Sequence, residues 1–134
     1  ERFGNPVLIK PRLGQGAFRV LVADAYTRRC AITGEKTFPV LEAAHIKPYA
    51  DSGPHQTANG LLLRSDIHKL FDKGYITVTE ELKVEVSSRI RSEFENGKEY
   101  YACHGKDLIV TPGNACEKPA AEYIRWHNDN LYRG

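Results

Sequence analysis

Two histidines, an asparagine and an aspartate in the middle of the sequence have types and spacings that suit hydrolytic chemistry. Asn59 follows His45 by 14 residues, and His68 follows Asn59 by nine. The His45 imidazole titrates near neutral pH and is therefore a candidate general base. His68 and Asp72 are spaced i, i+4, so on a helix their side chains project side by side and can bind one divalent cation. Two protein ligands leave positions for water and phosphate oxygens, as Mg²⁺ prefers.

Each of these residues also has an ordinary structural interpretation. His45 could be a partly buried, hydrogen-bonded histidine at the end of an apolar strand. Asn59 precedes a glycine, and Asn-Gly is a strong turn signal. His68 and Asp72 could form a surface ion pair. The choice between structure and chemistry depends on the elements that position these side chains.

The surrounding sequence predicts a two-stranded unit followed by a helix. Two apolar runs, CAIT (30–33) and FPVLEAAHI (38–46), are typical of short strands, with GEKT as the turn between them. The Pro, Gly, Asp and Ser content of residues 47–58 indicates a loop. A helix over residues 65–73 is indicated by a candidate N-cap serine at its start and a glycine after its end.

Further elements are expected on both sides of this unit. Residues 1–14 contain two prolines and two glycines, which indicate an extended arm or linker, and residues 15–134 are expected to form a single domain. The additional expected elements are a helix over 15–29, a hairpin of strands at 75–79 and 82–87, a short helix over 88–96, a strand over 107–112 and a C-terminal helix with Pro119 in its first turn. The predicted fold class is α+β, with flanking helices and a small additional antiparallel sheet.

The motifs around the candidate residues resemble those of the HNH endonuclease family. AAHI contains the first histidine, NGLLL the asparagine and DIHKLFDKG the second histidine, in the order and spacing of that family. The similarity extends upstream to RRCAITG and covers roughly residues 26–78. It is strongest toward the zinc-free HNH domains of bacterial restriction-type endonucleases. It implies a ββα-metal finger over about residues 29–74, in agreement with the strand, strand, helix order predicted above.

The resemblance also implies a role for each candidate residue. His45 would be the general base that deprotonates the attacking water. Asn59 would brace the loop and hold the histidine strand in place. His68 would ligate a catalytic Mg²⁺ or Mn²⁺ ion, and Asp72 lies where many relatives carry a further ligand. Cleavage would leave 5′-phosphate and 3′-hydroxyl ends, as in the family.

Two features depart from the family pattern. Many relatives carry Asp or His directly before the catalytic histidine as a metal ligand. This chain has Ala44 there, and Glu42 on the same strand is the residue that could compensate. Many relatives also fold around a zinc knuckle of paired CxxC motifs, whereas the three cysteines here are isolated. We therefore expect no structural zinc, and we expect the flanking helices to support the finger.

Other residues near and beyond the motif receive less specific assignments. Four basic residues flank the expected site and are candidates for nucleic-acid phosphate contacts, or else solvated surface charges: Lys47, Arg64, Lys69 and Lys73. His55 is expected to be a loop residue and not a ligand. The remaining residues are expected to be structural, with the two aromatic ones in the core: His104, His127, Tyr123 and Trp126.

Composition places the chain among ordinary globular proteins. Its 134 residues are 41% hydrophobic and 27% charged, with a net charge of +2. The sequence has no apolar window long enough to span a membrane, no signal-peptide region and no cysteine pairs, so we expect a cytoplasmic location and no membrane partner. Residues 1–50 carry eight Lys and Arg against four Asp and Glu, a balance that suits phosphate contact. Because the chain contains no methionine, we expect it to be a C-terminal fragment of a longer protein.

The resemblance implies a metal-dependent endonuclease that hydrolyses DNA in restriction or defence against foreign DNA. A homodimer and an upstream target-recognition domain, which relatives often carry, are left open. Two other functions are also left open: a non-catalytic DNA-binding module of the same fold, and a metal-dependent ribonuclease with the same residues. The non-catalytic alternative predicts that His45, Asn59 or His68 is lost, and all three are present. DNA is favoured by the resemblance and not by composition.

Overall fold

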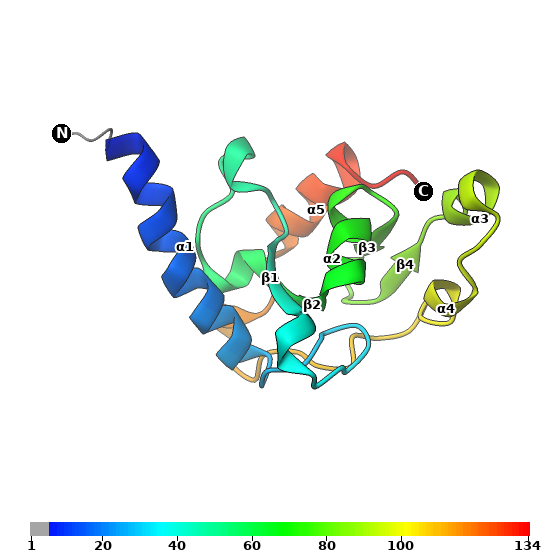
Figure 1. Cartoon of the computed structure of the whole chain (residues 1–134), viewed down its shortest axis with the longest axis horizontal. Helices are drawn as coiled ribbons and strands as arrows, with labels where there is room; N and C mark the ends of the chain where they lie inside the picture. Colours follow the sequence, from blue (N-terminus) through cyan, green and yellow to red (C-terminus); the bar gives the residue numbers. More distant parts are fainter. Residues whose placement is uncertain (1–5) are drawn as a thin grey trace.

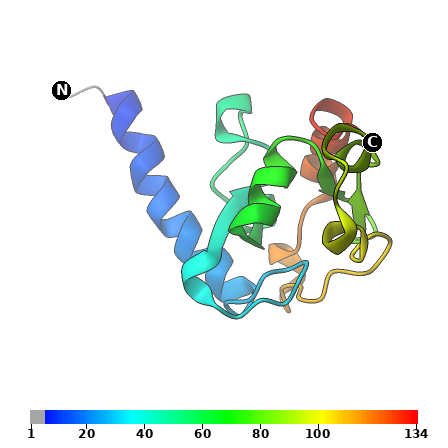
Figure 2. The ribbon, with the colours of Figure 1, turned by 45° about the vertical axis from the view of Figure 1, so that its right-hand side comes forward.

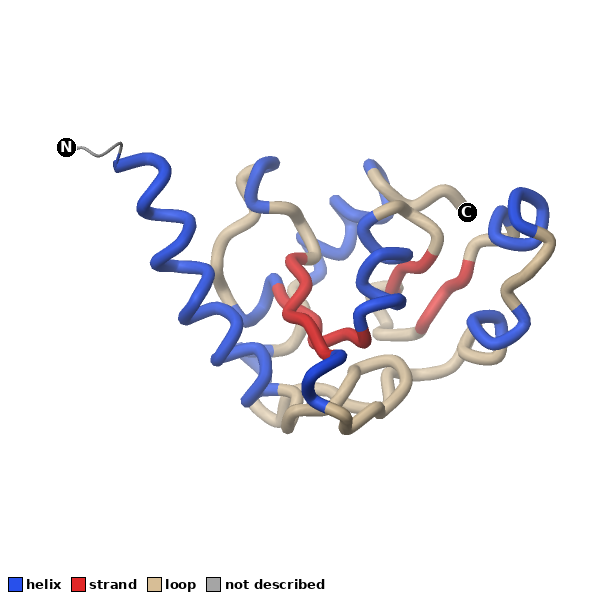
Figure 3. Tube along the Cα trace, in the orientation of Figure 1, coloured by secondary structure: helices blue, strands red, loops and turns tan. Residues whose placement is uncertain are grey.

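The fold combines helices with two small antiparallel sheets. The computed structural model describes the backbone of residues 6–134 and the side chains of residues 14–134. The elements are α1 (Pro6–Ala25), β1 (Leu41–His45), β2 (Gly60–Arg64), α2 (Ser65–Asp72), β3 (Ile76–Val78), β4 (Val84–Val86), α3 (Arg89–Phe94), α4 (Lys98–Tyr101) and α5 (Ala121–Asn130). Figure 1 shows α1 along one side of the first sheet and α3 and α4 at the opposite end of the molecule. Coloured by secondary structure, the trace in Figure 3 shows the two short sheets on either side of α2. The predicted α+β class is confirmed.

The first sheet and the helix after it form a ββα unit, but its second strand is not where we predicted a strand. β1 runs antiparallel to β2, with His45 opposite Gly60 at one end of the ladder. The prediction of a strand at residues 30–33 is wrong, because this segment forms a turn. The leucines of β2 are buried on both faces of the sheet, which explains why their run lacks the alternation typical of a half-exposed strand.

The turn at residues 30–33 is hydrogen-bonded to β2 but does not add a strand to the ββα unit. The Ala31 N–H donates to the Leu62 carbonyl at 2.8 Å, and the Ala31 carbonyl accepts from the Ile109 N–H at 2.8 Å. The buried Cys30 Sγ accepts from the N–H of Arg64 at 3.3 Å and from that of Thr33 at 3.4 Å. The apolar residues of this segment are therefore buried in a turn held from two sides.

Helix α1 starts much earlier than the sequence indicated. Residues 6–14, which we expected in an extended arm, are helical, and residues 1–5 of that arm lie outside the described part of the chain. Pro6 is the first helical residue, where a missing N–H costs no hydrogen bond, whereas Pro11 lies inside the helix, where nothing in the sequence predicted that it would be accommodated. The helix ends at Ala25, four residues before its predicted end, because Thr27 and Arg28 adopt positive φ angles of 51° and 57°.

The packing of α1 explains why this helix forms. Phe18, Val22 and Tyr26 are spaced at four-residue intervals and are buried against the first sheet. The Tyr26 hydroxyl donates to the Gly60 carbonyl at 3.0 Å. Seen from the side in Figure 2, the N-terminal half of α1 extends away from the sheets. The C-terminal half of α1 is thus the part that supports the ββα unit, as expected for a flanking helix.

The second half of the chain confirms some elements and corrects others. The hairpin β3–β4 and the short helix α3 lie within the predicted segments, whereas α4 was not predicted. The predicted strand at residues 107–112 is wrong, because within the described residues this segment forms a single bridge between Asp107 and Lys83. The C-terminal helix α5 begins at Ala121, so Pro119 precedes the helix and is not in its first turn.

A single core connects the two sheets. In α2, Ile67 and Phe71 are buried, and Gly74 follows the helix at φ +83°, which confirms the expected stop. Ser65 is the first helical residue and not the N-cap. From α5, the buried His127 stacks on the Phe71 ring at 3.8 Å between centroids.

Across the described residues, no helix has the length and apolar content needed to cross a membrane.

Candidate active site

One cleft contains three of the four residues that the motif analysis selected. His45 is the last residue of β1, while His68 and Asp72 lie one turn apart on α2. The cleft has a volume of about 330 Å³ and is lined by Gln15, Ala43, His45, Pro48, Tyr49, His68, Asp72 and Leu131. The antiparallel β1–β2 ladder and the direct continuation of β2 into α2 bring these segments together.

The His45 imidazole is half-buried and enclosed by two other rings. Phe18 of α1 stacks on it at 4.0 Å between centroids and an interplanar angle of 9°. On another side, His45 Nε2 lies 2.9 Å from His55 Nδ1. Burial and, to a smaller extent, the neighbouring His55 lower the pKa of His45 from about 6.5 to about 4. The ring is therefore neutral at neutral pH, as a general base must be.

Asn59 lies at the end of the loop, immediately before β2, and is fully buried. Its Oδ1 accepts from the Lys47 N–H at 2.8 Å, and its Nδ2 donates to the Lys47 carbonyl at 2.9 Å and to the Pro54 carbonyl at 3.1 Å. These bonds tie the two ends of the 47–58 loop together directly after His45. Asn59 does not line the cleft, so its contacts are those of a brace.

His68 lies between two carboxylates. Its Nδ1 is 2.7 Å from Glu42 Oε1, and its Nε2 is 3.1 Å from Asp72 Oδ2. Hydrogen bonding to Asp72, followed by that to Glu42, outweighs burial and raises the pKa of His68 above its usual range. The two ring nitrogens therefore have different partners: Glu42 on one side, and Asp72 in the cleft on the other.

The His68 and Asp72 pair fits a divalent cation by its chemistry and spacing. His68 Nε2 and Asp72 Oδ2 lie 3.1 Å apart as an i, i+4 pair, and an imidazole nitrogen and a carboxylate oxygen could together bind one divalent cation. No set of three or more His, Cys, Asp or Glu side chains within residues 14–134 is arranged to hold a metal. Ala44 is fully buried, and Glu42 contacts the other nitrogen of His68. Within residues 14–134, His68 and Asp72 are therefore the pair in the cleft lining that remains a candidate for binding a cation.

The four basic candidates lie outside the lining of this cleft. Lys69 and Lys73 are exposed on α2 and just after it, and Lys47 Nζ lies 5.7 Å from the centre of the Trp126 ring. Arg64 is held in a bidentate ion pair with Asp66 at 2.7 and 3.0 Å. Arg64 therefore has a structural role in the sheet-to-helix connection, while the three lysines present their charge near the surface.

Several expectations about aromatic and histidine residues are changed by the structure. His127 is buried, as expected for a structural residue, and His104 is exposed and accepts from the Val86 N–H at 3.0 Å. Tyr123 packs against the core, but Trp126 is only partly buried. His55, expected to be a loop residue, does lie in the loop but also contacts His45. The sequence carries no local signal for that contact, because it depends on how the loop folds back over the end of β1.

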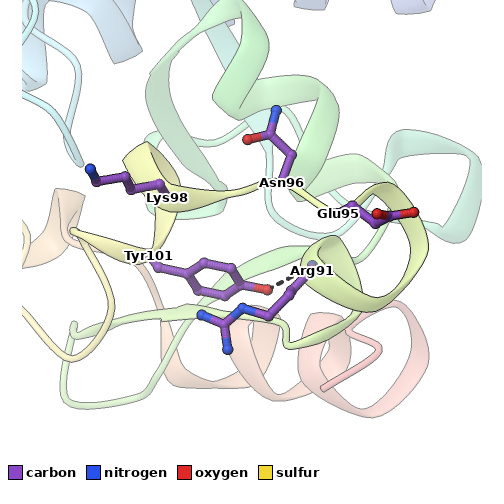
Figure 4. Close-up of a pocket in the computed structure, with 5 residues that line it drawn as sticks. All are labelled: Arg91, Glu95, Asn96, Lys98 and Tyr101. Atoms are coloured by element: carbon purple, nitrogen blue, oxygen red, sulfur yellow. Dashed lines mark hydrogen bonds between the residues drawn. The ribbon is translucent and has the colours of Figure 1, made fainter.

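A second hollow lies at the opposite end of the molecule. It is lined by Arg91, Glu95, Asn96, Lys98 and Tyr101, none of which lines the cleft at His45. Figure 4 shows the bond in which the Arg91 N–H donates to the Tyr101 hydroxyl, at 3.0 Å. The Tyr101 hydroxyl in turn donates to the Ser87 carbonyl at 2.7 Å. The first of these bonds connects α3 to α4, and the second connects α4 to the segment just before α3, so Tyr101 has a structural role.

Comparison with known families identifies the class of protein. Residues 30–79 match the sequence profile of a family described as HNH endonuclease. The match contains the whole β1–β2–α2 unit and the residues His45, Asn59, His68 and Asp72. This segment therefore matches an HNH endonuclease domain, and the match supports a nuclease enzyme. The resemblance stated from the motifs is confirmed.

A solved structure has the same fold over most of this chain. It is described as "Modification dependent TagI restriction endonuclease", with a TM-score of 0.59 and 23% sequence identity. The likeness covers 87% of this chain and 38% of the other. A comparison of the sequence with curated proteins gives no match. At this level of identity, the likeness concerns the fold.

Proposed function

We propose that this chain hydrolyses phosphodiester bonds of DNA, with His45 as the general base and a divalent metal ion on His68 and Asp72. The observation that carries the proposal is the shared cleft, where a neutral imidazole lies beside a metal-competent pair. Such a site can deprotonate water and hold a scissile phosphate in one place.

His45 supplies the proton acceptor for the attacking water. Its position at the end of β1, with Phe18 against one ring face, restricts the imidazole to one orientation. Asn59 supports this orientation because its three bonds fix the backbone directly after the histidine strand. General-base assistance of this kind typically contributes about 10²–10⁴-fold to the rate.

Mg²⁺ or Mn²⁺ bound by His68 and Asp72 would stabilise the negative charge that develops on the phosphate and on the leaving 3′ oxygen. Glu42 prepares His68 for this role by accepting its Nδ1–H at 2.7 Å, so that Nε2 faces Asp72 and could exchange its proton for the metal ion. In this proposal Glu42 orients the ligand and is not a ligand itself.

DNA and restriction are the preferred substrate and context. The fold is shared with a protein described as a modification-dependent restriction endonuclease. That chain is more than twice as long as the matched part, so it has room for the target selection that restriction requires. Lys47, Lys69 and Lys73 would contact phosphates outside the cleft. A metal-dependent ribonuclease with the same residues is the second candidate, since the cleft by itself does not distinguish the two sugars.

The test is a cleavage assay with supercoiled plasmid and with structured RNA, each with Mg²⁺, with Mn²⁺ and with EDTA. We expect metal-dependent nicking of the plasmid, with open circles appearing before linear DNA, because the site at His45 would cut one strand at a time. His45→Ala should reduce the rate at least about 10²-fold. Glu81→Ala, at the exposed tip of the β3–β4 hairpin, is the matched control.

Three results would contradict the proposal. No cleavage of either substrate would exclude the catalytic role and favour a non-catalytic DNA-binding module. Cleavage of RNA alone would favour the ribonuclease. Equal activity of His45→Ala and Glu81→Ala would exclude His45 as the base.

A further inference from the structure

His55 contacts the proposed general base through one hydrogen bond. His45 Nε2 and His55 Nδ1 lie 2.9 Å apart, and the ring centroids are 5.0 Å apart with the rings tilted by 60°. One of these two nitrogens carries the proton and the other accepts it. The direction of this bond decides which nitrogen of His45 is free.

Only one direction is compatible with a base. If the His45 Nε2–H donates to His55 Nδ1, the lone pair on His45 Nδ1 is free to take a proton from water. If the His55 Nδ1–H donates instead, the neutral His45 ring carries its proton on Nδ1, and neither ring nitrogen can accept another. A base at His45 therefore requires that His55 act as the acceptor.

We infer that His55 is a positioning residue: its Nδ1 accepts the Nε2–H of His45 and keeps His45 Nδ1 unprotonated for the attacking water. This inference rests on the proposed function, because it assigns a partner to the base named there. His55 acts through His45 and does not touch the substrate in this scheme.

The His55 ring is fixed by contacts from two elements. The Tyr49 ring stacks on it at 4.5 Å between centroids and an interplanar angle of 8°. Gly14 of α1 approaches its edge so closely that an added Cβ would lie 2.5 Å from His55 Cδ2. Both contacts concern the position of the ring, and neither uses the hydrogen-bonding capacity of Nδ1. That nitrogen is therefore left to His45.

The other nitrogen of His55 points to a functional role. His55 Nε2 is buried and has no hydrogen-bond partner within the part of the chain that the structure describes. Leaving a buried polar atom unpaired is costly, so this nitrogen requires an explanation, and a catalytic role of the side chain is one that fits its position. With Nδ1 as acceptor, the ring proton of His55 resides on this unpaired Nε2.

An imidazole partner suits a base better than a carboxylate does in this position. A carboxylate at the His45 Nε2–H would raise the pKa of His45, as Asp72 and Glu42 do for His68. Burial lowers the pKa of His45 to about 4, and His55 brings no negative charge that would oppose this shift. The imidazole pair therefore orients the base while keeping it unprotonated at neutral pH.

The proton balance of the step is simple. One O–H bond of water breaks, its proton moves to His45 Nδ1, and the electron pair stays on the oxygen that bonds to phosphorus. The bond from phosphorus to the 3′ oxygen breaks with its electron pair on that oxygen, which takes a proton from solvent. His45, now an imidazolium, keeps its Nε2–H on His55 Nδ1 and then releases the Nδ1 proton to solvent.

The first test measures the tautomers directly by ¹⁵N NMR of the histidine rings in the metal-free chain at pH 7. We expect a protonated Nε2 and an unprotonated Nδ1 for both His45 and His55. A protonated Nδ1 on His45 would overturn the inference. Because this measurement needs no catalysis, it remains decisive even if the chain proves not to cleave DNA, which would contradict the proposed function separately.

The second test compares two substitutions of His55 in the plasmid assay. His55→Phe keeps a flat ring against Tyr49 but cannot accept a hydrogen bond, whereas the side-chain oxygen of His55→Asn can replace Nδ1 as acceptor. We expect kcat to fall at least about tenfold in His55→Phe with KM unchanged, and to recover partly in His55→Asn. Unchanged kcat and an unchanged His45 tautomer in His55→Phe would overturn the inference.

The third test uses two glycines of α1. Gly14→Ala pushes against the His55 ring, whereas a Cβ at Gly16 meets nothing within 4 Å. Both changes raise helix propensity by about 1 kcal/mol, so their effects on the helix itself are matched. We expect a lower kcat and a mixed His45 tautomer only for Gly14→Ala. Wild-type tautomers and kcat in both variants would overturn the role of the α1 contact in holding His55.

Discussion

The residues around His45 determine the protonation state of its ring. Phe18 covers one ring face and His55 occupies Nε2, so the imidazole is partly withdrawn from water. Burial is the largest cause that disfavours the imidazolium, and the charge of Asp72 opposes it only in part. A solvent-exposed histidine in the same sequence would be half protonated near pH 6.5.

The first prediction concerns the titration of His45. Because its pKa is lowered to about 4, the ring should remain neutral from pH 8 down to near pH 5 and titrate only with a midpoint of about pH 4. The ring resonances of His45 in an NMR pH titration of the metal-free chain provide the measurement. The same resonance in urea should titrate near pH 6.5. A midpoint near 6.5 in the folded chain would show that the ring is open to solvent.

The second prediction concerns Glu42. Replacing this carboxylate by the neutral amide in Glu42→Gln weakens the bond that orients His68, so we expect Mn²⁺ affinity to fall about 10–100-fold. Isothermal titration of the chain with Mn²⁺ gives the dissociation constant. Glu81→Gln removes the same charge at the exposed hairpin tip and should leave the affinity unchanged. Equal Mn²⁺ affinity of both variants would show that Glu42 does not support metal binding by His68.

At the level of elements, α1 is part of both the core and the active site. Phe18 is 2% exposed and faces the His45 ring, while Val20 on the opposite face is 61% exposed. A single helix face therefore contributes to stability and to the orientation of the base.

The third prediction follows from this double contact. Phe18→Ala should lower the free energy of unfolding by about 3–5 kcal/mol, because it removes a fully buried ring and leaves a cavity. Val20→Ala should change it by no more than about 0.5 kcal/mol. Urea denaturation of both variants tests this. A loss of less than about 1 kcal/mol in Phe18→Ala would mean that α1 does not pack on the sheet as described.

The fourth prediction concerns the docking of α5 through His127. Its Nε2–H donates to the Phe71 carbonyl and its Nδ1 accepts from the Thr77 hydroxyl, and burial lowers its pKa. As pH falls below about 6.5, the unfolded chain binds a proton that the folded chain resists, so the stability contributed by His127 is full above that pH and is lost below it.

His127→Gln removes this titration and keeps a side-chain donor. Urea denaturation at pH 7.5 and at pH 5 should show that the variant is less stable than the native chain at pH 7.5 and that the difference narrows at pH 5. A difference that widens at pH 5 would mean that His127 is charged in the folded chain.

Local patterns were sufficient for some elements and insufficient for others. α2, β1 and the β3–β4 hairpin were predicted because their periodicity and flanking turn residues act within a few positions. The strand expected at residues 30–33 failed because strand pairing is decided by distant partners, and β2 pairs with β1 instead. The prediction of an extended arm over residues 6–14 was wrong, because these residues are helical. Composition alone does not tell whether a proline starts a helix or prevents one.

Some contacts of the candidate site could be predicted from local sequence, and others could not. The spacing of His68 and Asp72 on one helix was enough to predict their contact, since a helix fixes that geometry. The contact between His45 and His55 depends on the fold of the 47–58 loop, and their packing depends on Phe18 and Gly14 of a distant helix. Neither could be read from local sequence.

For the molecule as a whole, the turn at residues 30–33 joins distant parts of the chain. It is bonded to β2 through Ala31 and Cys30, and to the segment after α4 through Ile109. The first sheet cannot separate from the second half of the chain without breaking these bonds.

The burial of Cys30 makes that separation measurable by thiol alkylation. Cys30 is fully buried, Cys116 is exposed, and burial raises the pKa of the partly exposed Cys103. In the native chain we expect Cys116 to react with iodoacetamide first, Cys103 more slowly, and Cys30 only when the turn detaches from β2. Low urea concentrations should accelerate the labelling of Cys30 alone, and equal labelling rates of Cys30 and Cys116 without urea would contradict the burial. The labelling rate of Cys30 then measures how often the turn at residues 30–33 detaches from the ββα unit that carries His45. The measurement needs no substrate or metal.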